Sequence, residues 1–177
     1  AGIFTAQFYG HGDTEGVRQT FRFKLWLAMV LTACTIVLFL TAGPNLIQFY
    51  LSGEGEAADA AAILSYGSQY LYVMLLGLPA FLVSQVYAST LRECGETVLP
   101  MKAGIVSVLV NLTFNYFLIY GKFFFPELGV TGAAIATVLS RYVEAAIIVA
   151  VTHRHSEKHT FAKGLYHTLK VPADLCK

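Results

Sequence analysis

Charged residues are scarce in this sequence. Asp, Glu, Lys and Arg make up 13% of its 177 positions, against roughly 25% in ordinary soluble domains. Hydrophobic residues make up 56%, which is more apolar surface than one water-soluble core of this size could bury. This composition excludes a disordered chain and a collagen-like fibre. It indicates a membrane protein.

Cysteine is also scarce, and catalytic motifs are absent. The three cysteines (Cys34, Cys94 and Cys176) show neither CxxC nor Cys/His spacing, so we expect no disulfide framework and no metal site. The sequence contains no Gly-rich phosphate loop, no GxSxG and no Ser/His/Asp arrangement. We therefore expect no enzyme, no catalytic residue and no cofactor. The net charge of +1 gives no reason to expect a nucleic-acid partner.

Long apolar runs, by contrast, are abundant. Crossing the hydrocarbon core as a helix takes about 20 apolar residues. Four runs meet this length, the last of them interrupted by Arg141 and Glu144: residues 25–51, a span within 60–91, 103–121 and 128–152. Short segments rich in glycine, proline and charge connect them. We predict an all-α integral membrane protein whose four spans lie in residues 25–152.

Lysine and arginine are distributed unevenly between the connecting segments. The segments on one side of the predicted membrane hold ten basic residues, and those on the other side hold only Lys122. Because cytoplasmic loops carry an excess of Lys and Arg, we predict that both ends of this chain face the cytoplasm.

The two ends of the sequence have distinct patterns. Residues 1–8 are typical of the last turns of an apolar helix, so we expect residues 1–24 to hold the end of a preceding helix and a cytoplasmic loop. Residues 153–177 are expected to form a basic cytoplasmic tail or a linker. From these patterns we expect a fragment of a longer chain.

The third predicted span carries a stripe of small and polar residues. At 100° per residue, the stripe falls within one narrow arc and consists of Gly104, Ser107, Asn111, Asn115 and Leu118. Two amides in hydrocarbon must find partners, because unsatisfied polar groups there are costly. They could bond to neighbouring helices, at ~0.6 kcal/mol each, or they could line a polar cavity for a solute or ion. The stripe alone leaves both interpretations open.

The fourth predicted span has a face of small residues and one carboxylate. Its members are Gly129, Gly132, Ala133, Ala136, Ser140 and Glu144. Small residues let another backbone approach closely. A charged residue within a span is a functional-site hypothesis by default. For Glu144 we favour a self-neutralising pair with Arg141, which lies three residues before it.

Several segments together resemble one family, the multidrug and toxic compound extrusion (MATE) transporters. Residues 6–18 and 91–100 resemble two of its cytoplasmic loops, and residues 111–121 and 127–137 resemble its fifth helix and the start of its sixth. The resemblance places the four spans as helices three to six of a twelve-helix transporter with two six-helix lobes. It implies a bacterial inner-membrane exporter that exchanges small cationic amphipathic compounds for H⁺ or Na⁺. Its partners would be the lipid bilayer and the remainder of the transporter.

The resemblance also suggests roles for particular residues. Asn111 matches an asparagine of the family's polar cavity, and Asn115 stands where some members have a carboxylate. The acidic residue of the first helix would lie upstream, which leaves the coupling ion open. Our candidates for the solute or ion pathway are Asn111, Asn115, Ser107 and Glu144. The candidate loop motif is Gln7, Gly10, Arg92, Gly95 and Pro100, and the candidate helix-packing residues are Gly129, Gly132, Ala133 and Ala136.

Two alternative functions fit the same four predicted spans. A flippase for lipid-linked oligosaccharides shares the broader architecture, but it would need basic residues facing its cavity, and only Arg141 is available in these spans. A non-transporting four-helix scaffold would assemble through the face from Gly129 to Ala136, so that Gly132→Leu would break assembly. Because alternating access requires two lobes, we expect no transport by these four helices alone.

Overall fold

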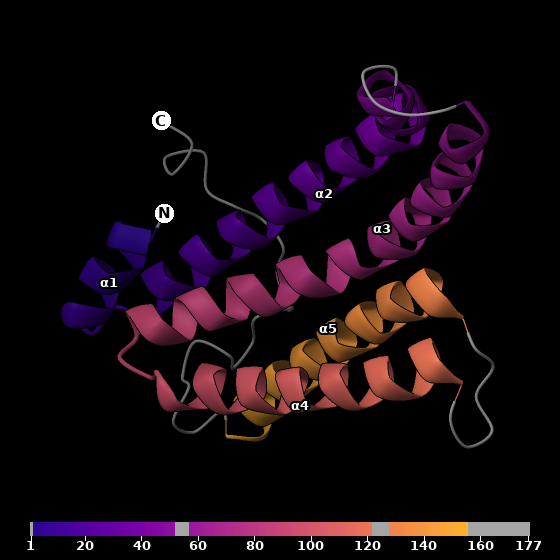
Figure 1. Cartoon of the computed structure of the whole chain (residues 1–177). Helices are drawn as coiled ribbons and strands as arrows, with labels where there is room; N and C mark the ends of the chain where they lie inside the picture. Colours follow the sequence, from indigo (N-terminus) through magenta and orange to yellow (C-terminus); the bar gives the residue numbers. More distant parts are fainter. Residues whose placement is uncertain (1, 52–56, 122–127, 156–177) are drawn as a thin grey trace.

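The computed structural model describes residues 2–51, 57–121 and 128–155, nearly all of which are helical. The helices are α1 (Gly2–Gly10), α2 (Thr14–Leu51), α3 (Ala57–Glu93), α4 (Val98–Tyr120) and α5 (Gly129–Arg154), and the described residues contain no strand (Figure 1). Helices α2 to α5 each contain a segment long and apolar enough to cross a membrane. The predicted all-α class with four candidate spans is confirmed.

The four long helices run alternately in opposite directions (Figure 1). Helix α3 packs against both α2 and α5, whereas α4 packs mainly against α5. As a result, α3 and α5 are neighbours although α4 lies between them in the sequence. The short helix α1 packs against α2 and α3.

One end of the bundle gathers the Lys and Arg side chains of the described residues, with the exception of Arg141 in the middle of α5. At this end α2 and α4 begin and α3 and α5 end (Figure 1). We call it the basic end; it holds Arg18, Arg22, Lys24, Arg92, Lys102 and Arg154. The gathering agrees with the charge pattern from which the topology was predicted, and the cytoplasmic placement of this end stays a prediction.

The buried core also lies towards the basic end. Phe21 of α2 and Tyr87 of α3 are almost fully buried, with their rings edge to face and 4.8 Å between centroids. Leu91 and Ile148 complete the core from α3 and α5. Elsewhere α2 and α4 expose many large apolar side chains, an arrangement suited to lipid or to further helices and not to water.

The segment 1–24 differs in detail from the expectation of a helix end followed by a loop. Only residues 11–13 separate α1 from α2. Asp13 explains the early start of α2, because its Oδ1 accepts the backbone N–H groups of Glu15 (3.1 Å) and Gly16 (3.0 Å) as an N-cap. Gly12, with φ of 76°, makes the turn before it.

The turn between α3 and α4 explains the second loop motif. Gly95 has φ of 80°, a left-handed conformation that favours glycine, and its N–H donates to the Arg92 carbonyl (3.0 Å). The Glu96 carboxylate accepts the N–H of Leu99 at the start of α4 (3.2 Å). Pro100 lies in the first turn of that helix, where a missing N–H leaves no helical hydrogen bond unmade.

Several expectations fall on residues outside the described ones. They concern the connecting segments 52–56 and 122–127 and the greater part of the expected basic tail, residues 156–177.

Candidate functional site

Small residues bring α4 and α5 into backbone contact. A Cβ added at Gly132 would lie 2.7 Å from the Leu118 carbonyl oxygen, and Ala136 has no exposed surface. Helix α4 of the same chain therefore packs against the small-residue face of α5. Ala133 on this face is half-buried. Gly129 differs from the packing expectation: a Cβ there would meet nothing within 4 Å, and its φ of 51° at the start of α5 is the reason for glycine.

The polar stripe of α4 faces the same interface. Ser107 is buried, and its hydroxyl donates to the Ser140 carbonyl (3.0 Å). The Asn111 amide donates to the hydroxyls of Thr137 (3.3 Å) and Ser140 (3.5 Å). The Asn115 amide donates back to Asn111 Oδ1 (2.9 Å). We call these five residues the α4–α5 polar cluster.

Most polar atoms of the cluster are hydrogen-bonded, but one side-chain oxygen has no donor among the described residues. The hydroxyls of Thr137 and Ser140 donate to carbonyls of their own helix. Asn115 Oδ1 is buried and accepts no hydrogen bond from the residues that the structure describes. Ser107 thus joins α4 to α5 through its hydrogen bond, whereas Asn115 keeps an acceptor available within the bundle.

Sequence analysis missed the role of Thr137 and assigned Ser140 only to the small-residue face. Both lie on α5 and supply the hydroxyls that the Asn111 amide contacts. Their role could have been predicted from their polarity within an apolar helix, because a hydroxyl in hydrocarbon needs a hydrogen-bond partner as much as an amide does.

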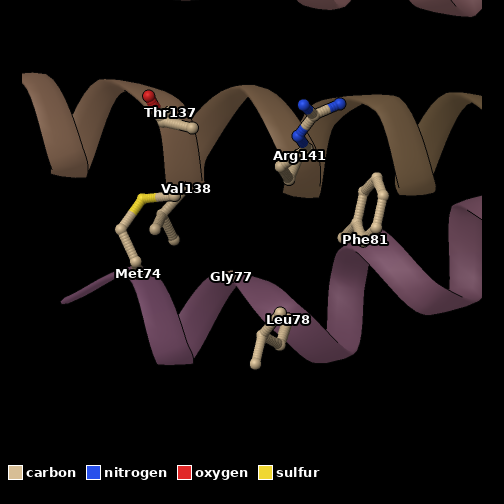
Figure 2. A pocket seen from close by; sticks show the side chains of 7 residues that line it. All are labelled: Met74, Gly77, Leu78, Phe81, Thr137, Val138 and Arg141. Carbon is tan, nitrogen blue, oxygen red and sulfur yellow. The ribbon is translucent and has the colours of Figure 1, made fainter. Parts of the chain in front are cut away.

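A cavity of about 220 Å³ lies beside the cluster, between α3 and α5. Its lining residues come from both helices (Figure 2): Met74, Gly77, Leu78 and Phe81 from α3, and Thr137, Val138 and Arg141 from α5. A Cβ at Gly77 would lie 3.1 Å from Val138 Cγ2, so this glycine permits close packing next to the cavity. Because Thr137 belongs to both features, the polar cluster borders the cavity.

Arg141 and Glu144 form the ion pair that sequence analysis favoured. Arg141 Nη1 donates to Glu144 Oε2 at 3.2 Å, and the guanidinium carbon lies 5.0 Å from the centroid of the Phe81 ring. Glu144 is 8% exposed and therefore lies inside the bundle with its cation beside it. The two cluster hydroxyls, of Thr137 and Ser140, and this pair occupy neighbouring turns of α5.

The remaining candidates lie at the basic end, apart from the cluster. Gln7, Gly10, Arg92 and Gly95 are exposed, and Pro100 is buried. They shape the turns described above.

The charges at the basic end perturb one thiol. Lys24 of α2 forms an ion pair with Glu93 of α3 and contacts the Thr90 hydroxyl at 3.4 Å. Burial raises the pKa of Cys94 from 9.0 to about 11, and the neighbouring Glu93 carboxylate adds to the shift. Within the described residues no group of three His, Cys, Asp or Glu side chains is placed to hold a metal ion.

Four antiparallel helices of membrane-spanning length, with polar side chains held between two of them, define an integral membrane protein of the helical-bundle class. The family assignment is more specific. The MatE family model matches residues 1–117, and the chain belongs to this family.

Curated relatives agree with the family match. The chain is 33% identical over 165 residues to a probable multidrug resistance protein NorM of Thermotoga maritima, covering 93% of this chain and 34% of that protein. It is 30% identical over 151 residues to the multidrug resistance protein MdtK of Pectobacterium atrosepticum, covering 85% and 32%. The chain thus spans about a third of the length of these relatives. The search of solved structures returned no match.

Proposed function

We propose that this chain is part of a multidrug exporter that moves small amphipathic cations across the membrane in exchange for H⁺ or Na⁺. Membership of the MatE family and relatives named multidrug resistance proteins support export. Because the chain spans about a third of those relatives, it would supply part of one lobe of the transporter.

The observation that carries the proposal is the α4–α5 polar cluster beside the α3–α5 cavity. The Asn115 oxygen has no described donor, and an amide oxygen suits both a hard cation and an ammonium group. Asn111 links the amide nitrogen of the same Asn115 side chain to Thr137, which lines the cavity. A cation held at Asn115 would therefore be coupled to the shape of the cavity through one hydrogen-bonded chain.

The face from Gly129 to Ala136, through which a scaffold would assemble, is occupied in this structure by α4. Gly132 and Ala136 are buried against the rest of the chain, and Gly132 faces the backbone of α4. A second copy could not use this face without displacing α4.

The test is dye efflux by cells that express the full natural chain. Asn111→Ala removes the amide that joins Asn115 to Thr137, and we expect efflux of a cationic dye to slow by about tenfold, which corresponds to ~1.4 kcal/mol. Thr113→Ala is the matched control, because Thr113 lies on the exposed face of α4 and, among the described residues, its hydroxyl bonds only the Leu109 carbonyl of its own helix. Unchanged efflux with Asn111→Ala at normal expression removes the cluster from the transport pathway.

The coupling ion needs a second measurement. In proteoliposomes, an imposed Na⁺ gradient and an imposed pH gradient are compared as driving forces for dye movement. The gradient that drives the wild type should lose effect in Asn115→Ala and keep it in Thr113→Ala. Equal loss in both variants would refute a specific role for the Asn115 oxygen.

A further inference from the structure

The cavity between α3 and α5 presents a cation at its edge. The Arg141 side chain is 40% exposed, whereas the Glu144 side chain that pairs with it is 11% exposed. The positive member of the pair thus faces the accessible space and the negative member is turned into the protein. A ligand that enters the cavity meets the cationic member of a neutral pair.

The guanidinium keeps hydrogen-bonding capacity in this position. Among the described residues it makes one hydrogen bond, through Nη1 to Glu144, although a guanidinium carries several donors in a fixed fork. Its contact with the Phe81 ring is a cation–π contact, which uses no N–H donor. Figure 2 shows the Phe81 ring reaching from α3 towards Arg141.

The rest of the lining is mainly apolar. Met74, Leu78 and Val138 contribute thioether and aliphatic surface, and the Thr137 hydroxyl is the other polar group. A pocket with apolar walls and one exposed guanidinium is complementary to an apolar group that carries a planar anion. A carboxylate matches the guanidinium fork in shape as well as in charge.

We propose that this cavity binds a carboxylate attached to an aromatic ring or a short aliphatic group, with Arg141 as the anchoring cation. A volume of about 220 Å³ is below the roughly 300–1,000 Å³ of sites for drug-sized ligands. It therefore accommodates a small aromatic acid, or the acidic end of a larger solute. The proposal extends beyond export of cations and does not depend on the α4–α5 polar cluster binding an ion.

The depth of Arg141 favours a solute over a lipid headgroup. Arg141 lies twelve residues after Gly129 and thirteen before Arg154, at the middle of α5. At about 1.5 Å per residue this is some 18–20 Å from either end of the helix. Headgroups lie near the ends of membrane spans, too far for a lipid carboxylate or phosphate to reach the guanidinium.

Glu144 provides a gain-of-binding test. Its charge lies next to the site of the incoming carboxylate and competes for Arg141. Glu144→Gln removes this competition and keeps the shape, so we expect tighter binding of the acid, by about threefold to tenfold. The double variant Arg141→Gln/Glu144→Gln removes the anchor while leaving no unpaired buried charge. It should weaken binding at least about tenfold, because a charge-assisted hydrogen bond is lost.

The experiment uses the full natural chain in lipid nanodiscs and two fluorinated probes followed by ¹⁹F NMR. We expect 4-fluorobenzoate to bind at least about tenfold more tightly than 4-fluorobenzylamine, which has the opposite charge on a similar ring. Leu78→Trp fills the cavity and should abolish benzoate binding. Leu109→Trp is the matched control on the exposed face of α4, where Leu109 is 58% exposed, and should leave binding unchanged.

Any of four results with the fluorinated probes overturns the proposal, and a fifth comes from the lipid exchange below. They are no benzoate binding by the wild type, equal binding of acid and amine, retained binding in Leu78→Trp, and unchanged affinity in both Glu144→Gln and the double variant. Replacing phosphatidylcholine with phosphatidylglycerol in the nanodisc separates the two sources of anion. Unchanged benzoate affinity supports a solute site, and competition by the anionic lipid refutes it.

Discussion

Gly132 offers the sharpest test of how α4 and α5 are held together. A Cβ at this position would lie 2.7 Å from the oxygen and 2.9 Å from the carbon of the Leu118 carbonyl. These are backbone atoms, so a change of rotamer cannot relieve the contact, and the two helices must separate. In Gly132→Ala we expect the Ser107–Ser140 hydrogen bond, which spans the same interface, to lengthen as well.

A second glycine separates the free-energy cost of overpacking at Gly132 from the gain in helix propensity. Overpacking of this kind costs about 1–3 kcal/mol, but alanine also improves helix propensity by up to ~1 kcal/mol over glycine. Gly104→Ala in α4 has the same propensity gain and no clash, because a Cβ there would meet nothing within 4 Å. The difference between the two variants is therefore the overpacking term, and Gly132→Ala should be less stable than Gly104→Ala by about 1–3 kcal/mol.

The assay is unfolding in mixed micelles with increasing sodium dodecyl sulfate, followed by far-ultraviolet circular dichroism. The free energies of unfolding of the wild type and both variants are compared. If Gly132→Ala is as stable as Gly104→Ala, the α4–α5 contact does not limit packing, and the argument from backbone contact fails.

Three further predictions concern the basic end and the α3–α5 contact. Because the folded thiol of Cys94 has a raised pKa, the unfolded thiol loses its proton first, and stability should fall between about pH 9 and about pH 11; a flat profile in that window contradicts this. Lys24→Met leaves Glu93 without its ion-pair partner and should lower the free energy of unfolding by about 1.5–3 kcal/mol, whereas Lys102→Met at an exposed position should change it by less than ~0.5 kcal/mol. Tyr142→Phe removes a 3.0 Å hydrogen bond to an α3 carbonyl and should cost about 0.5–1.5 kcal/mol in the same unfolding assay; no loss would show that this bond is replaced in the variant.

The turns and helix starts show which features could be predicted from the local sequence and which could not. The motif residues Gly95 and Pro100 were selected through a resemblance, and their physical reasons, a left-handed φ and a place in a first helical turn, became visible only in the backbone. The early start of α2 at Thr14 depends on the Asp13 cap, a local signal that could have been found in the sequence. Gly129 and Gly132 look alike in sequence, yet one relieves a backbone angle and the other a contact with Leu118.

The sequence by itself determined the all-α class, the four candidate spans and the segregation of basic residues, because a bilayer imposes these demands on each segment separately. It also placed Asn111 and Asn115 on one face, since that follows from helical periodicity alone. Tertiary structure decided that this face meets Thr137 and Ser140 of α5, that α3 and α5 line an open cavity, and that Arg141 and not Glu144 faces it. Those features depend on which helices become neighbours, and side chains from two helices must pack together before any of them exists.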